Sequence, residues 1–263
     1  MLKREFKYNL KSFLIWTMAS VVLLLIIFLI YPMIINGENM KLIDQFMEAF
    51  PEEILKTFNM DLASLDSAYG WLKTEGFVFL SLILGCYSAI LGSNILLKEE
   101  NDKTIEYLNS LPITRNEIVL KKSIVGISYI VLMVLIFGVV NYTGLTLSGT
   151  FDIKQFILMS ITPIFSSITI FFACLFLSTY THKTKKMIGI SLGIVLISYI
   201  LQTLSTLAKE TAFFQYFSVF TLADLRNVIL NIKINPLMII LTILISGLFL
   251  ILTLIRYNKK ELV

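Results

Sequence analysis

Residues 13–35 read FLIWTMASVVLLLIIFLIYPMII, an apolar run without a charged side chain. A helix crosses the hydrocarbon core of a bilayer, about 30 Å thick, in roughly 17–25 residues, so this run is long enough to span a membrane. It exceeds the apolar region of a secretory signal peptide and has no small-residue cleavage site before Tyr31-Pro32. We therefore expect it to be retained as a membrane anchor.

Five more apolar runs of similar length follow the first. They cover residues 77–97, 124–147, 156–180, 187–207 and 236–255. Hydrophobic residues make up 57% of the chain and charged residues 15%, a balance outside that of soluble domains. Uninterrupted runs favour helices over the alternating strands of a membrane barrel. The sequence predicts an all-α integral membrane protein in which residues 1–263 form one six-helix transmembrane domain.

The segments between these runs hold unequal numbers of Lys and Arg residues. One set contains 15 basic residues and the other contains 7. The first set is residues 1–12, 98–122, 181–186 and 256–263, and the second is 36–76, 148–155 and 208–235. Basic residues concentrate on the cytoplasmic side, so we expect a multi-pass plasma-membrane protein with both termini in the cytoplasm. The net charge of +4 then reflects topology rather than nucleic-acid binding.

The first twelve residues are amphipathic at helical spacing. Leu2 and Phe6 belong to an apolar row, and Lys3, Arg4 and Lys7 lie in a basic row beside it. This pattern is typical of a helix that lies in the membrane interface. Two roles stay open: an anchor that attracts anionic membrane lipid, or an elbow helix that presses against a cytoplasmic partner.

Two longer segments are expected on the outer side. Residues 36–76 are too polar to cross the membrane and contain apolar residues at helical spacing, which predicts a small helical cap. Residues 208–235 are rich in aromatic side chains and too short to cross and return. For this second segment we expect a shallow re-entrant or interfacial helical pair, with an aromatic belt as the alternative.

The span interiors contain no Asp, Glu, Lys, Arg or His, which argues against ion coupling through buried acids. No cluster of catalytic or metal-binding residues occurs, the single histidine, His182, is expected to be solvated, and no phosphate-binding loop is present. The chain is therefore expected to be no enzyme by itself and to bind no metal. Mild polar residues within the spans serve helix packing or line a pathway. The pathway candidates are Asn94, Asn141, Thr143, Ser166 and Gln202.

The segment 98–122 stands out because it carries ten charged residues in a mostly apolar chain. Ile105, Leu108 and Leu111 repeat every third residue, which predicts a short helix with a narrow apolar edge. Pro112 is expected to end that helix. Such a helix would lie across the membrane face.

A second helix is predicted to begin directly after this proline. Thr114 is followed three residues later by Glu117, the spacing of a capping box, just before an apolar run. We expect the helix to continue into the third span, with Lys121 and Lys122 extending to the membrane surface where it enters. The loop thus predicts a surface helix, a sharp corner and a rigid lever.

This loop resembles the coupling region of the ATP-binding-cassette (ABC) type-2 permease family. The family pattern has a Glu, then Gly-Thr, leucines, Pro, Ser or Thr, Arg, and a Lys before the third span. The glycine is replaced by Lys103 here, a departure that concerns the local turn geometry. The residues that match are Glu100, Thr104, Leu108, Leu111, Pro112, Thr114, Arg115 and Lys121.

The resemblance implies the membrane subunit of an ATP-driven exporter. A cytoplasmic ABC ATPase subunit would bind ATP and Mg, this chain would bind no cofactor, and a second permease chain would complete a homodimer or heterodimer. The cargo would be amphipathic (a peptide, an antibiotic or a lipid-like molecule), with the peptide and antibiotic-resistance exporters as the nearest branch. The implied ATPase contacts are Glu100, Thr104, Ile105, Glu106, Tyr107, Leu108, Leu111, Pro112, Thr114, Arg115 and Glu117.

Two other functions are compatible with the residues alone. The chain could be a non-transporting sensor or assembly protein that uses loop 98–122 to bind a partner. It could also be an ion-coupled carrier, in which case transport would depend on an ion gradient rather than on ATP.

Overall fold

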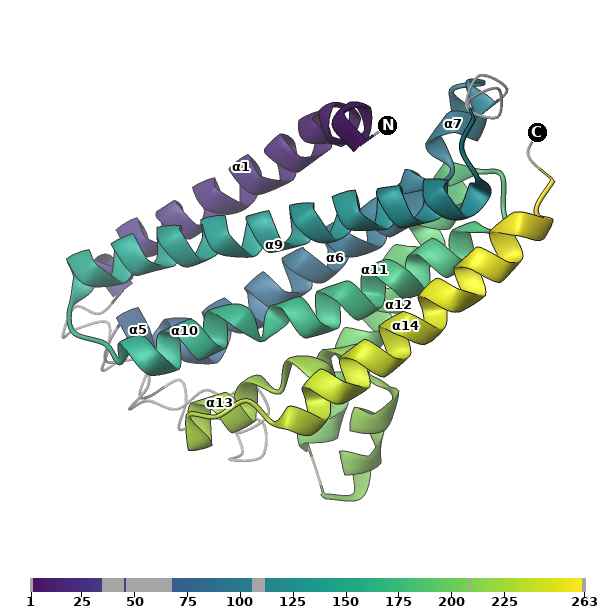
Figure 1. The fold of residues 1–263 in the computed structure, drawn as a ribbon. Helices are drawn as coiled ribbons and strands as arrows, with labels where there is room; N and C mark the ends of the chain where they lie inside the picture. The colour runs from purple at the N-terminus through teal and green to yellow at the C-terminus, as the bar shows by residue number, and fades with distance from the viewer. Residues whose placement is uncertain (1, 35–44, 46–67, 106–111, 208, 262–263) are drawn as a thin grey trace.

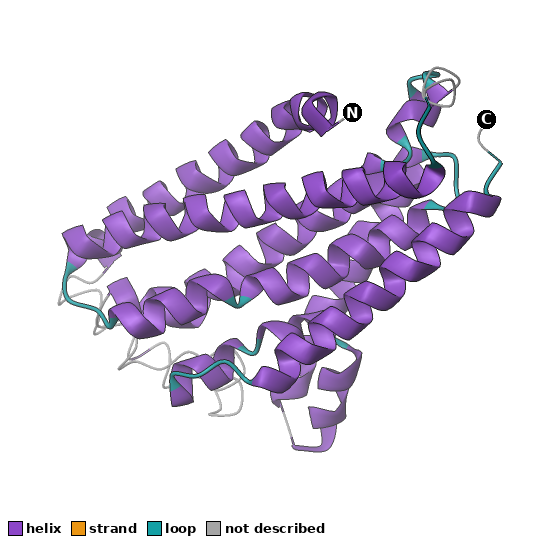
Figure 2. Ribbon diagram, viewed as in Figure 1, coloured by secondary structure: helices purple, strands orange, loops and turns teal. Residues whose placement is uncertain are grey.

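The computed structural model describes residues 2–34, 45, 68–105, 112–207 and 209–261. Within those residues all regular structure is helical (Figure 2). Six helical segments are long and apolar enough to cross a membrane. They are α1 (Leu2–Ile34), α6 (Phe77–Ile95), α9 (Arg115–Ser148), α10 (Ile153–Ile161) together with α11 (Pro163–Ser178), α12 (Thr184–Leu207) and α14 (Pro236–Lys259). The predicted all-α membrane fold is confirmed.

The bundle is built around α6 and α11. In the most apolar stretch of α6, 61% of the residues are buried, whereas the corresponding fraction is 22% in α12 and 17% in α14. Figure 1 shows α1 lying along α9 at one edge of the bundle and α14 at the other. Both chain ends lie at the same end of the bundle as α7 (Lys98–Asn101).

Close contact between α6 and α11 depends on a glycine. A Cβ atom added at Gly92 would lie 2.4 Å from the backbone carbonyl oxygen of Phe171. In lipid, helices associate through close packing rather than through the hydrophobic effect, and small residues allow that approach. Gly126 of α9 accommodates the ring of the same Phe171, so three helices meet at this phenylalanine.

The first helix is continuous from its amphipathic start into its span. Both rows expected in residues 1–12, the apolar one and the basic one, are exposed. The face that α1 turns toward the bundle is instead a largely polar third row. Its buried residues are Glu5, Asn9, Phe13, Thr17, Ser20 and Leu24.

The fourth span is interrupted, whereas an unbroken helix over residues 156–180 was predicted. Pro163 has no N–H group, so the carbonyl four residues earlier loses its helical partner. The Thr162 hydroxyl donates to that Met159 carbonyl at 3.1 Å and satisfies it inside the bundle. The span therefore consists of α10 and α11, joined at Thr162.

The outer segments are only partly described. Before α6 lie α5 (Ala68–Trp71) and the π-helix η1 (Leu72–Gly76), whereas most of the expected cap in residues 36–76 falls outside the described residues. Between α12 and α14 lie three short helices instead of the expected pair. They are the 3-10 helices η2 (Lys209–Phe217) and η3 (Val219–Ala223), followed by α13 (Leu225–Asn231).

Candidate functional site

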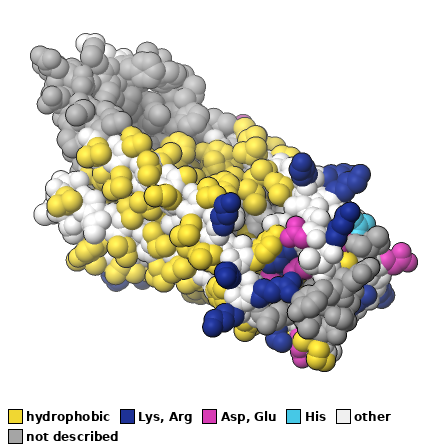
Figure 3. Space-filling model, turned by 90° about the horizontal axis from the view of Figure 1, so that it is seen from above, with side chains coloured by type: hydrophobic (Ala, Val, Ile, Leu, Met, Phe, Trp, Pro, Cys, Tyr) yellow, Lys and Arg dark blue, Asp and Glu magenta, His cyan; other side chains and the backbone are white. Residues whose placement is uncertain are grey.

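The charged loop emerges from one end of the bundle, where basic and acidic side chains gather (Figure 3). The chain leaves α6 through a turn and forms α7, whose first three residues point into the protein. Lys98, Glu99 and Glu100 expose only 3%, 2% and 8% of their surface. Charged groups are this deeply buried only when they are paired.

A first cluster joins Glu5, Lys98, Glu99 and Lys122. The Lys98 ammonium lies 2.5 Å from a Glu5 carboxylate oxygen, and the Lys122 ammonium lies 2.5 Å from Glu99 and 3.9 Å from Glu5. Lys122 also donates to the carbonyl of Ile95, the last residue of α6. Two carboxylates balance two ammonium groups, which compensates their removal from water. The cluster connects α1, α6, α7 and α9.

The position of Lys122 corrects one expectation. It was expected to extend to the membrane surface, but its side chain is fully buried because both carboxylates of the cluster face it. Lys121 does reach outward, and its ammonium pairs with exposed Glu117 at 3.3 Å.

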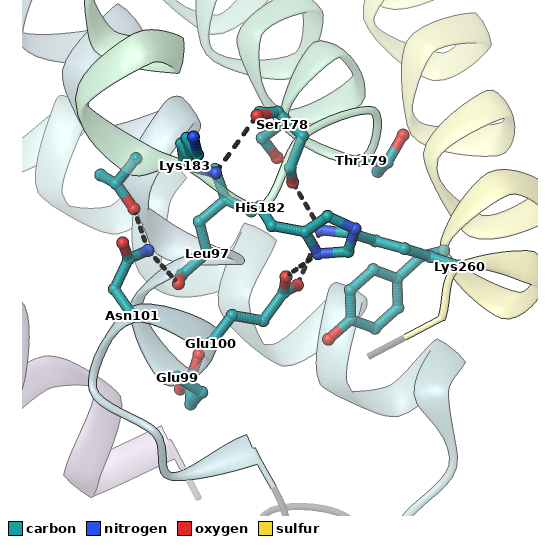
Figure 4. A network of polar contacts seen from close by, with 12 residues as sticks. Leu97, Glu99, Glu100, Asn101, Ser178, Thr179, His182, Lys183 and Lys260 are labelled. Carbon is teal, nitrogen blue, oxygen red and sulfur yellow. Dashed lines mark hydrogen bonds and ion pairs between the residues drawn. The ribbon is translucent and has the colours of Figure 1, made fainter. Parts of the chain in front are cut away.

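A second cluster forms around Glu100, as Figure 4 shows. One carboxylate oxygen accepts a hydrogen bond from the Lys260 ammonium at 2.7 Å, and the other lies 2.6 Å from Nδ1 of His182. Lys260 also donates to the Thr181 carbonyl at 2.8 Å. Burial lowers the pKa of Lys260, and its hydrogen bond to Glu100 opposes that shift. His182, expected to be solvated, is half-exposed and contacts Glu100, so this cluster connects α7, the turn before α12 and the end of α14.

The start of α9 is held at both backbone and side-chain level. The Thr114 hydroxyl accepts a hydrogen bond from the Glu117 N–H at 3.2 Å, which confirms the predicted helix cap. The Arg115 guanidinium donates to the carbonyls of Tyr257, Asn258 and Lys260 at 2.7–3.1 Å. These carbonyls end α14 without helical partners, so Arg115 caps that helix.

Lys103 adopts the backbone conformation that glycine favours. Its φ is 55°, in the left-handed region. The Thr104 N–H donates to the Glu99 carbonyl at 2.8 Å and the Lys103 N–H to the Glu100 carbonyl at 3.4 Å, the two bonds of a Schellman motif that ends α7. The turn that the family pattern assigns to glycine is thus formed with lysine here.

The predicted ATPase contacts fall into three groups. Thr104, Pro112, Thr114 and Glu117 are exposed. Glu100 and Ile105 are buried and Arg115 is partly buried beneath them in the capping contact. Glu106, Tyr107, Leu108 and Leu111 lie outside the described residues.

The N-terminal segment reaches the loop through residues that the sequence analysis did not select. Leu2, Lys3, Arg4, Phe6 and Lys7 have exposed side chains, whereas the contacts come from the opposite face of α1. The Tyr8 hydroxyl donates to the Asp102 carboxylate at 2.6 Å, and the Lys98 ammonium lies 4.2 Å from the centre of the Tyr8 ring. The recurrence of Glu5 and Asn9 four residues apart was the available signal.

The five pathway candidates do not converge on one site. Asn141 lines a crevice between α6, α9 and the fourth span, and the other four do not line it. Thr143 is exposed, Ser166 donates to the Pro163 carbonyl, and Gln202 accepts a hydrogen bond from Thr221 of η3. Asn94 lies at the opposite end of α6, one residue before the helix ends.

Comparison with known proteins identifies the family. A family model described as ABC-2 family transporter protein matches residues 62–252, which is most of the chain. The chain belongs to the ABC-2 transporter family. Comparisons with curated proteins and with solved structures gave no match. This ABC-2 permease is therefore a multi-pass membrane subunit of an ABC transporter, is not itself the catalytic subunit, and has an ABC ATPase as its partner.

Proposed function

We propose that this ABC-2 permease is the membrane subunit of an ATP-driven exporter that moves an amphipathic peptide, antibiotic or lipid-like molecule out of the cytoplasm. The ATPase subunit binds ATP and Mg, and segment 98–122 is its docking element. A second permease chain, identical or different, completes the transporter. Family membership supports the permease and its ATPase partner, and the way segment 98–122 is fastened supports the docking role.

The observation that carries this proposal is the pair of buried clusters at the base of the loop. Glu99 and Lys122 stand near the two ends of segment 98–122 and are joined directly. Glu5 fastens the same base to α1, and Lys260 fastens it to the end of α14. A push on the exposed loop is therefore transmitted to the first, third and last spans together.

The two buried clusters make this transmission stiff. Breaking one buried ion pair typically costs about 3–5 kcal/mol, because the remaining charge is left unpaired in a poorly solvated site. A surface loop without such contacts would bend under load before the spans moved. The loop base instead behaves as one body with the ends of three spans.

A docking experiment tests the proposal directly. The permease is extracted gently with its ATPase subunit, and ATP hydrolysis is measured for the wild type, Leu108→Arg and the control Leu108→Met. On the predicted apolar edge of residues 105–111, arginine should abolish ATPase retention, whereas methionine should preserve it. Retention of the ATPase by Leu108→Arg would contradict the docking assignment.

A transport experiment tests direction and cargo. Inside-out vesicles that contain the permease and its ATPase should accumulate a fluorescent amphipathic peptide only when ATP is supplied. Accumulation that survives ATP depletion but stops when the ion gradient is dissipated would instead indicate an ion-coupled carrier. Absence of any co-purifying ATPase would contradict the exporter.

A further inference from the structure

A crevice in the outer half of the bundle contains a buried polar atom that the docking function does not use. Its wall includes Phe77 and Leu84 of α6, Phe137 and Asn141 of α9, and Pro163 at the start of α11. Asn141 lies seven residues before α9 ends, about 10 Å along the helix axis from that end. The crevice is thus remote from the charged loop at the other end of the bundle.

Asn141 is built into this crevice in an unusual state. Its residue exposes 1% of its surface, and its side-chain oxygen has no hydrogen-bond partner among the described residues. Buried side-chain oxygens in native proteins are nearly always paired, because an unpaired acceptor has lost its water without replacement. Asn141 therefore offers a free acceptor to whatever occupies the crevice.

The remaining wall defines what could fill it. Aromatic and aliphatic side chains surround the amide, and the crevice with its mouth holds about 250 Å³ of empty space. That is slightly below the roughly 300–1,000 Å³ of pockets for drug-sized ligands. A Cβ atom added at Gly138, also on the wall, would meet no atom within 4 Å, so this part of the crevice is open. An alkyl chain fits these dimensions.

We infer that the crevice binds the alkyl part of an amphipathic molecule whose hydroxyl or amide N–H donates to the side-chain oxygen of Asn141. The interrupted fourth span makes room for it. Pro163 lines the crevice, and the half-buried Ser160 beside it has already donated its hydroxyl to the Phe156 carbonyl. Asn141 is therefore the polar group that selects a donor-bearing ligand. This site does not depend on the proposed docking of segment 98–122.

Photolabelling with a matched pair of probes tests the site. The full-length permease in phospholipid nanodiscs is exposed to a diazirine-bearing dodecanol or to the same diazirine on dodecane, and labelled peptides are identified by mass spectrometry. The alcohol should label the α6 and α9 walls about fivefold more than the hydrocarbon, the ratio expected for one hydrogen bond. Equal labelling, or label spread over the exposed faces of α12 and α14, would overturn the inference.

Three variants sharpen the result. Asn141→Leu should reduce labelling by the alcohol about fivefold, and Gly138→Leu, which fills the crevice, should remove labelling by both probes. Thr143→Val is the control on the same helix, because its exposed hydroxyl donates to the Val140 carbonyl, and it should label like the wild type. Wild-type labelling of Asn141→Leu would overturn the role of the amide.

Stability provides a readout that needs no ligand. Asn141→Leu removes an unpaired buried acceptor, so its melting temperature should equal or exceed that of the wild type. A clearly lower melting temperature would show that the oxygen has a protein partner and would overturn the inference. A resident lipid with a free hydroxyl and a passing cargo share this chemistry. Constant labelling during ATP hydrolysis by the co-purified ATPase would indicate a resident molecule, and loss of label would indicate cargo; either supports the site.

Discussion

Among single residues, Glu5 and Lys98 form a contact that mutation can test by removing one charge or both. Their side chains are 2% and 3% exposed and lie 2.5 Å apart. Glu5→Gln or Lys98→Met leaves a buried charge unpaired, and we expect either to lower the free energy of unfolding by about 3–5 kcal/mol. The double variant should lose less than the sum of the two, because it leaves no net charge behind. Chemical unfolding of the purified permease measures all three.

A matched control lies one turn into α9. Glu117 and Lys121 form an ion pair at 3.3 Å, but their side chains are 50% and 34% exposed. Removing either charge should cost at most about 0.5 kcal/mol, since water screens the pair. Equal losses at the buried and the exposed pair would show that the cluster contributes no more than a surface contact.

Lys103 provides a prediction of opposite sign. A non-glycine residue in the left-handed region carries strain of roughly 1–2 kcal/mol, and the lysine side chain is exposed. Lys103→Gly should therefore raise the free energy of unfolding by up to about 1 kcal/mol, since the freer unfolded chain offsets part of the gain. Lys103→Ala is the control and should bring no gain. Destabilisation by glycine would contradict the Schellman turn.

Sequence reasoning at this scale succeeded where a residue acts on its own neighbours. The Thr114 cap follows from a spacing of three residues, and the Lys103 turn from one missing glycine. Glu5, Lys98 and Lys260 were missed because their partners are distant along the chain. Nothing local indicates that an N-terminal glutamate will meet the first lysine after the second span.

Among the helices, the packing of α6 on α11 is open to test at Gly92. Alanine there would place its methyl group 2.4 Å from a backbone oxygen that cannot move without displacing α11. We expect Gly92→Ala to destabilise the bundle by at least the 1–3 kcal/mol typical of overpacking. Thermal unfolding of the purified permease gives the comparison.

Gly189 is the corresponding control within a helix interior. A Cβ atom there meets nothing within 4 Å, so Gly189→Ala should be neutral or stabilising by up to about 1 kcal/mol, the difference in helix propensity. If both variants behaved alike, propensity rather than close approach would explain Gly92.

On the outer side, Gln155 holds three short elements together. Its amide oxygen accepts a hydrogen bond from the Tyr69 hydroxyl at 2.9 Å, and its amide nitrogen donates to the Ile229 carbonyl at 2.8 Å. Gln155→Met should free α13 by about 1–3 kcal/mol, the cost of the groups left unpaired. Hydrogen exchange across residues 225–231 should accelerate. Asn231→Ala, which removes a contact within α13 alone, should change it much less.

The helices themselves were largely predictable because length and hydrophobicity determine a membrane span. Their ends and interruptions were less so. The run at 156–180 is apolar throughout, and only the missing N–H of Pro163 divides it. The short helices of residues 209–231 depend on contacts with α12, such as the Ser198 hydroxyl that receives the Val219 N–H, and no periodicity reports those.

For the whole molecule, the distribution of Lys and Arg predicts orientation. Single cysteines placed at Lys3 and Glu261 should react with a membrane-impermeant maleimide only after cells are permeabilised, whereas one at Ile153 should react in intact cells. All three positions are exposed. Cys86 and Cys174 lie within spans and should stay unlabelled. Labelling of Lys3→Cys in intact cells would reverse the orientation.

At this scale the sequence predicted the class of molecule and the place of its charged loop, because both depend on composition along the chain. The clusters beneath the loop required knowledge of which helix ends meet. Absence of charge from span interiors was correct for the apolar runs as drawn, but α1 and α9 extend beyond those runs and bring Glu5 and Lys122 into the bundle. Helix length beyond the apolar core was the missing quantity.

The contact between Glu100 and Lys260 also has a consequence for biogenesis. A ribosome releases α7 into the membrane well before it makes α14, so Glu100 waits for its ammonium partner until the sixth span is complete. During that interval the end of α7 holds a carboxylate prepared for a counterion that does not yet exist. Chains that stall before the sixth span would present this charge to quality-control proteases, and completed chains would conceal it.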